Sequence, residues 1–107
     1  MLRFFALILV IGSAFSAGTA SAEPSELQLL LQKNNCLACH KIDKRKYGPT
    51  LKEVAEKYAG DSGAVEKLAA KIKAGGTGVW GEDVMPPQAQ VSDAEAQKIA
   101  KLVLSLQ

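Results

Sequence analysis

Cysteine, histidine and strand-forming patterns are scarce in this chain. Its 107 residues include two cysteines and one histidine, whereas a structural zinc site usually uses four such ligands. β-Branched residues are few and no apolar run alternates with polar residues, which argues against a β-sheet. The 13 basic residues nearly balance the 11 acidic ones, so the charge gives no indication of nucleic-acid binding. The chain also lacks internal repeats and low-complexity tracts.

The first 22 residues have the features of a secretory signal peptide. Arg3 provides a short positive region, and the apolar stretch 4–15 is too short for a transmembrane helix of about 20 residues. The Ala-Ser-Ala tripeptide at 20–22 matches a signal cleavage site. An uncleaved membrane anchor is the alternative. We therefore predict a signal peptide at 1–22, one domain at 23–107, a periplasmic location, and no stable membrane insertion after cleavage.

Large aromatic side chains are few once residues 1–22 are set aside. All three phenylalanines lie in that segment, and the remaining aromatic residues are Tyr47, Tyr58 and Trp80. A domain of about 85 residues buries only about 60–65% of the surface that its unfolded chain exposes. A core of this size needs a cross-link or a cofactor to become stable.

Residues 36–40 read Cys-Leu-Ala-Cys-His and match the Cys-x-x-Cys-His signature of covalent haem attachment. The thiols of Cys36 and Cys39 can add across the two vinyl groups of haem to form thioethers. His40 is then adjacent and can bind the iron. A redox dithiol, which usually needs a βαβ context, and a partial metal site are the alternatives. Haem attachment in bacteria takes place outside the cytoplasm, so the export signal agrees with the haem interpretation.

Four segments are predicted to be amphipathic helices, because their apolar residues recur at intervals of three and four. Capping boxes are predicted at Ser25, Thr50 and Ser92. Gly60 and Gly75 are expected to end the second and third helices. The four apolar stripes are Leu27, Leu30 and Leu31; Leu51, Val54, Ala55 and Tyr58; Val65, Leu68, Ala69 and Ile72; and Ile99, Leu102, Val103 and Leu106.

The helical pattern is interrupted from Gly75 to Val91. A loop of this length in a small domain is usually functional. It contains Met85, the one methionine left when the signal peptide is removed, and a thioether can serve as an axial haem ligand beside histidine. The alternative is a methionine that fills a gap in the core. His40 is the sole histidine, so two histidine ligands are impossible, and a lysine ligand would first have to lose its proton.

These motifs together resemble those of class I cytochromes c, in particular the short bacterial type that donates electrons to nitrite reductases or terminal oxidases. The resemblance covers 23–107 and implies an all-α cytochrome c fold, with four to five helices around one covalently attached haem c. The N- and C-terminal helices are expected to cross near one haem edge. The matching segments, in order, are 36–40, Tyr47-Gly48-Pro49, Gly78-Val79-Trp80-Gly81, Met85-Pro86-Pro87 and 92–96.

The resemblance also implies roles for residues outside the attachment motif. The carbonyl of Pro49 would accept the Nδ1 hydrogen of His40, which fixes the ring and raises its basicity. Trp80 would donate its indole N–H to a haem propionate, and Lys71 would lie nearby. The ordinary alternatives are a turn proline at Pro49 and a core aromatic at Trp80.

Three features depart from the family pattern. Many relatives have an asparagine that can hydrogen-bond the methionine sulfur where this chain has Gln88. The stretch 88–90 is one residue longer than usual. Many relatives also have a tryptophan where this chain has Leu102, which predicts a smaller helix contact at that position.

Iron bound by both His40 and Met85 has no open coordination position for a substrate. We therefore predict an electron carrier and not an enzyme; the alternative is a small haem enzyme, or an electron-transfer subunit, with a labile sixth ligand. The expected partners are a cytochrome bc-type donor and a nitrite reductase or cytochrome oxidase acceptor, and the chain itself is expected to be a monomer. A basic cluster is predicted to steer an acidic partner, unless it is simply a solvated loop. Its residues are Lys41, Lys44, Arg45 and Lys46.

Overall fold

The computed structural model describes residues 12–14, 18 and 25–106, and the predicted cleavage site at 20–22 lies outside these described residues. Apart from an isolated β-bridge between Gly76 and Met85, this part of the chain contains no strand. The predicted all-α class is therefore confirmed. The elements, in chain order, are α1 (Glu26–Lys33), the short 3₁₀ helix η1 (Cys36–Ala38), α2 (Leu51–Lys57), α3 (Ala64–Ala74) and α4 (Asp93–Leu104).

The first two predicted capping boxes are complete. The Ser25 hydroxyl accepts the N–H of Gln28, and the Gln28 amide oxygen accepts the N–H of Ser25. Thr50 and Glu53 make the same reciprocal pair at the start of α2. Each pair satisfies two backbone donors that a helix start otherwise leaves without partners, so the sequence fixes where these helices begin.

The third capping box is only half formed. The Ser92 hydroxyl accepts the N–H of Glu95 at 3.1 Å, as predicted. The Glu95 carboxylate, however, accepts a hydrogen bond from Lys33 at 3.0 Å, and no bond from it to the Ser92 N–H is present in the described structure. The prediction failed here because a partner on α1 competes with the local one.

The predicted helix end holds for α3 but not for α2. Asn35, just after α1, has a left-handed backbone with φ 59°, which its short polar side chain tolerates. Gly75 ends α3 with φ 68°. The helix α2 ends at Lys57, three residues before Gly60, which was expected to end it. The chain then turns through Gly60 with φ 78°.

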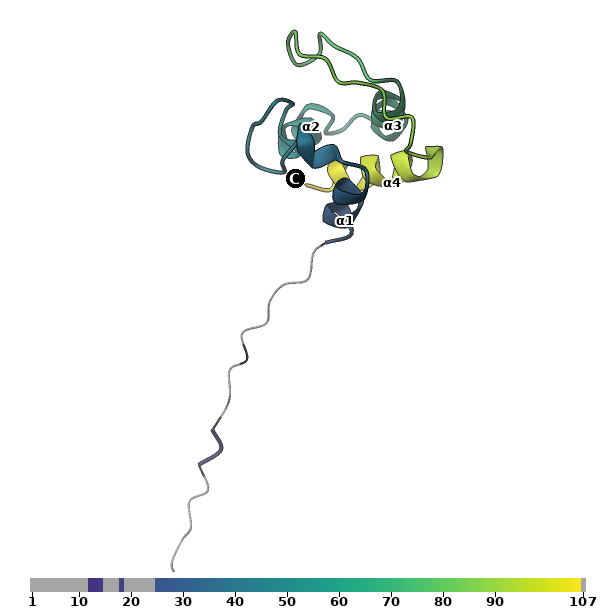
Figure 1. The fold of residues 1–107 in the computed structure, drawn as a ribbon. Coiled ribbons are helices and arrows are strands. Elements are labelled where there is room, and N and C mark those ends of the chain that lie inside the picture. The colour runs from purple at the N-terminus through teal and green to yellow at the C-terminus, as the bar shows by residue number, and fades with distance from the viewer. Residues whose placement is uncertain (1–11, 15–17, 19–24, 107) are drawn as a thin grey trace, which may run out of the picture.

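The last helix, α4, contacts α1, α2 and α3 and so organises the fold (Figure 1). Two ion pairs, Lys33 with Glu95 and Lys98 with Glu26, connect α4 to α1. The predicted pairing of the terminal helices is thus present. The half-buried Leu102 packs against the core from α4.

The core is built from small and medium side chains, and its largest fully buried members are Leu31 and Val91. None of the helices in the described ranges has the length and apolar character needed to cross a bilayer. The buried apolar residues are Leu27, Leu31, Leu51, Val54, Ala55, Ala64, Leu68, Ala69, Val91, Ala96, Ile99, Ala100 and Val103.

Candidate haem-binding site

An apolar cavity opens between the attachment segment 36–40 and the loop 75–91; together with the open solvent at its mouth, its volume is about 1310 Å³. Helices α3 and α4 also contribute to its walls. Much of the hydrophobic core faces this space, so the core is hollow on this side. The core residues that line the cavity are Leu31, Leu51, Val54, Leu68, Ile99, Ala100 and Val103.

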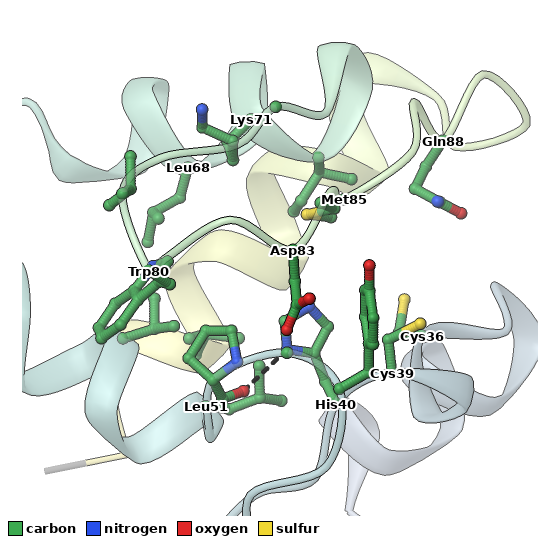
Figure 2. A pocket seen from close by; sticks show the side chains of 18 of the residues that line it. Cys36, Cys39, His40, Leu51, Leu68, Lys71, Trp80, Asp83, Met85 and Gln88 are labelled. Carbon is green, nitrogen blue, oxygen red and sulfur yellow. Dashed lines mark hydrogen bonds between the residues drawn. The ribbon is translucent and has the colours of Figure 1, made fainter.

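The attachment segment is a tight turn whose backbone is fixed locally. The carbonyl of Cys36 accepts the N–H of Cys39 at 3.2 Å and the N–H of His40 at 3.0 Å. All three side chains line the cavity and are half-buried (Figure 2), and both cysteines are free thiols. Two thiols and an imidazole therefore face the same apolar space.

The Cys36 thiol is not activated as a thiolate. Burial raises its pKa above the ordinary cysteine value; a backbone hydrogen bond partly opposes this shift, and the negative charge of Glu95 adds to it. Reactive dithiols need a lowered pKa and positive surroundings. The environment of Cys36 is therefore the opposite of that expected for thiol–disulfide exchange.

The imidazole of His40 is oriented from behind by Pro49. The distance from His40 Nδ1 to the carbonyl oxygen of Pro49 is 2.9 Å. A carbonyl can only accept, so Nδ1 carries the hydrogen, and in the neutral imidazole Nε2 then has the lone pair. Gly48 makes this approach possible, because a Cβ atom there would lie 2.6 Å from His40 Cε1.

Met85 enters the cavity from the opposite side, across from His40 (Figure 2). Its N–H donates to the carbonyl of Gly76 at 2.8 Å, and its carbonyl accepts the N–H of Gly76 at 2.9 Å. Gly75 packs directly on this backbone, since a Cβ atom there would lie 2.2 Å from the Met85 oxygen. The Met85 side chain is half-buried, and its backbone is fixed relative to the end of α3.

Trp80 and Lys71 line the same cavity from the loop and from α3. Trp80 is half-buried, and the ammonium of Lys57 lies 5.5 Å from the centre of its ring. The Lys71 side chain runs along Gly76, where an added Cβ atom would lie 2.6 Å from Nζ. The structure thus brings every predicted site residue to one cavity, namely Cys36, Cys39, His40, Pro49, Lys71, Trp80 and Met85.

Two features of the site were not predicted from the sequence. Tyr47 and Asp83 also line the cavity, and no spacing or motif gave Asp83 a role. Gln88 does not reach the sulfur of Met85; its amide donates to the carbonyl of Pro86 at 3.0 Å and accepts from Gln90 at 2.9 Å. Figure 2 shows the Gln88 side chain directed away from Met85.

The donor set and the walls fit a haem. An apolar cavity with two thiols and a histidine on one side and a thioether on the other matches covalent attachment and His/Met ligation. No group of three His, Cys, Asp or Glu side chains that could hold a bare metal ion occurs in the described part of the chain.

Comparisons with known proteins agree with this chemistry. The cytochrome c family profile matches residues 28–107. The chain is 47% identical over 90 residues to cytochrome c-552 of Nitrosomonas europaea, covering 84% of each chain. It is 46% identical over 98 residues to cytochrome c-551 of Pseudomonas aeruginosa, covering 92% of this chain and 90% of that protein.

A solved structure shares the fold. The crystal structure of wild-type Nitrosomonas europaea cytochrome c552 is similar with a TM-score of 0.71 and 49% identity, over 73% of this chain and 96% of that one. With the Cys-x-x-Cys-His segment in place, membership implies one covalently bound haem c and redox proteins as partners. The chain therefore belongs to the class I monohaem cytochromes c of the c-551/c-552 type, and it is a small electron carrier and not an enzyme.

Proposed function

We propose that this cytochrome is a periplasmic one-electron shuttle with His40 and Met85 as the two axial ligands. The observation that carries the proposal is the placement of these side chains on opposite walls of one apolar cavity, each with a fixed backbone. When bound, haem c supplies an iron that alternates between the ferrous and ferric states. Every further feature of the mechanism comes from the protein.

The two ligand side chains differ in how they are held. The Pro49 carbonyl keeps the hydrogen on His40 Nδ1, so Nε2 presents its lone pair to the cavity and becomes more basic. The thioether of Met85 has no proton to gain or lose. Methionine and histidine as the two ligands raise the reduction potential of the iron relative to two nitrogen ligands. Because both side chains stay in place when the charge changes, reorganisation during electron transfer is small.

Lys71 and Trp80 are proposed to bind the haem propionates. Lys71 offers an ammonium at the cavity rim, and Trp80 offers an indole N–H from the cavity wall. Lys57, over the Trp80 ring, adds a second positive charge in this region. Two carboxylates can therefore be neutralised at the rim without charged groups entering the apolar interior.

Electron exchange requires an accessible edge. Tyr47, Val79 and Val84 line the cavity and are 47%, 44% and 54% exposed, so they form an apolar rim at its mouth. The basic cluster is also exposed, and Arg45 itself lines the cavity. We propose that the basic cluster steers an acidic partner and that the apolar rim makes the short-lived contact.

In this proposal, the mature protein comprises residues 23–107 and is a monomer in the periplasm. Its donor would be a cytochrome bc-type complex, and its acceptor a nitrite reductase or cytochrome oxidase. The Ala-Ser-Ala cleavage pattern at 20–22 and the extracytoplasmic chemistry of haem attachment support the location. The N-terminal sequence of the mature protein from a periplasmic extract should begin at Glu23.

The spectrum of the ferric holoprotein tests the ligation. His40 and Met85 ligation predicts low-spin iron with a methionine–iron charge-transfer band and a reversible one-electron titration. Acid-acetone extraction of the denatured protein should leave haem on the chain, because both thioethers are covalent. A high-spin ferric spectrum would instead indicate an open site and would overturn the proposed ligation.

A further inference from the structure

Tyr47 connects the two halves of the cavity. It lies directly before Gly48 and Pro49, which orient His40, and its hydroxyl accepts the N–H of Val84 at 3.2 Å. Val84 in turn lies directly before Met85. In the described part of the chain, this is the one hydrogen bond that joins residues 36–50 to residues 75–88.

The other hydrogen bonds of residues 75–88 lie on their own side of the cavity. Further along the loop, the Gln90 amide donates to the carbonyl of Asn34, just before the attachment segment, at 3.4 Å. The N–H of Met85 donates to Gly76 at 2.8 Å, and the N–H of Gln88 donates to Ile72 at 3.1 Å. The intervening Pro86 and Pro87 have no N–H to donate. The part of the loop around Met85 is therefore fixed to α3 and to itself, and its hydrogen bond to residues 36–50 is the one from the Val84 N–H to Tyr47.

We propose that Tyr47 is a positioning residue whose hydroxyl fastens the methionine loop across the cavity mouth. This inference rests on the His40/Met85 ligation proposed above. Movement of Met85 away from the cavity would carry Val84 with it and break the bond to Tyr47. The bond therefore opposes loop opening, although Tyr47 is 47% exposed and water competes for its hydroxyl.

Tyr47→Phe tests the proposal, because it keeps the ring and removes the hydroxyl. The first measurement is cyanide binding to the ferric holoprotein, which requires Met85 to leave. We expect binding to become about fivefold tighter, the factor that corresponds to one ordinary net hydrogen bond. The second measurement is hydrogen exchange of the Val84 amide, which should become faster by a similar factor.

Thr77→Val is the matched control. The Thr77 hydroxyl donates to the carbonyl of Glu82 at 3.0 Å, within the same loop and without crossing the cavity. Its loss should change cyanide binding much less than the loss of the Tyr47 hydroxyl. Exchange at Val103, in the buried core of α4, reports global unfolding and should stay at its wild-type rate in Tyr47→Phe.

The outcomes separate this inference from the proposed ligation. A wild-type protein without the methionine charge-transfer band would overturn both. A wild-type band with unchanged cyanide binding and Val84 exchange in Tyr47→Phe would overturn the role of Tyr47 alone. Equal effects from Thr77→Val, or equally faster exchange at Val84 and Val103, would show a general loss of stability and would also overturn it.

Discussion

Lys33, the last residue of α1, donates a hydrogen bond of 3.0 Å to the carboxylate of Glu95 in the first turn of α4. The contact joins the two terminal helices where α1 ends and α4 begins. The hydrogen bond from Lys33 is the main cause that holds the pKa of Glu95 below its ordinary range. Stability should therefore depend on pH through this pair.

Glu95→Gln should lower stability at neutral pH. A carboxyl whose folded pKa is lowered stabilises the fold above its unfolded pKa, and this contribution is lost as the pH falls through the folded value. The difference in the free energy of unfolding between Glu95→Gln and the wild type should therefore shrink once the pH drops below about 4.3. Denaturant unfolding across this range is the measurement. Glu56→Gln is the control, because Glu56 is exposed and forms no ion pair in the described structure; a pH-independent difference for Glu95→Gln would contradict the assignment.

Gly48→Ala should displace the imidazole of His40. The new Cβ would lie 2.6 Å from His40 Cε1 and 2.9 Å from Nδ1, closer than atoms can pack. Overpacking of this kind costs about 1–3 kcal/mol, and the bond to Pro49 should weaken. Denaturant unfolding and the NMR signal of the His40 ring N–H measure the two effects. Gly63→Ala, where the nearest atom is 3.5 Å away, should be close to neutral.

Met85→Ala should open the sixth coordination position while the thioether links stay intact. The charge-transfer band should disappear, the potential should fall, and cyanide or carbon monoxide should bind. Met85→Leu separates a ligand from a core filler, because it keeps the volume and removes the sulfur. A filler would lose less than about 1.5 kcal/mol and keep its spectrum, so a wild-type spectrum in Met85→Leu would refute ligation.

Cys36→Ala/Cys39→Ala should leave a largely unfolded or molten chain. Without the thioether links haem is no longer held, and the core residues that line the cavity then have no apolar surface to pack against. Isolated helices below about 12–15 residues are marginal in water, and α1, α2 and α3 have 8, 7 and 11 residues. Calorimetry and side-chain NMR of the haem-free variant provide the test. A cooperative thermal transition with sharp signals would show that the core is sufficient without haem.

Lys44→Glu/Lys46→Glu should slow electron transfer to an acidic partner, most strongly at low salt. Both lysines are exposed, whereas Arg45 is 3.8 Å from Glu53 and so partly neutralised. Surface charges act through solvent with a Debye length of about 8 Å at physiological ionic strength. Stopped-flow rates at several salt concentrations measure the effect, and the potential should not change.

A charge control separates local steering from net charge. Lys44→Glu and Lys101→Glu change the net charge equally, but Lys44 is next to Arg45, which lines the cavity, whereas Lys101 lies on the exposed face of α4. The Lys44 change should have the larger effect. Equal effects, or none at any ionic strength, would place the contact elsewhere.

Local features of the fold and site could be predicted from the sequence. The attachment segment, two capping boxes and Gly75 depend on residues a few positions apart, so their patterns are readable. The bond from Val84 to Tyr47 and the partner of Glu95 depend on residues that only the folded chain brings together. No periodicity encodes such contacts, which is why α4 lacks its expected capping box and why the role of Tyr47 was missed.

The distribution of the site along the chain has a consequence for assembly in the cell. Cys36, Cys39 and His40 are near neighbours, so an extended polypeptide can already present them to the attachment machinery. Met85 follows about 45 residues later, and its arrival requires closure of a long loop and docking of α3 and α4. Under the proposed ligation, coordination by Met85 would be the last step of maturation. The methionine–iron charge-transfer band would then measure the fraction of fully folded molecules among chains that already carry covalent haem.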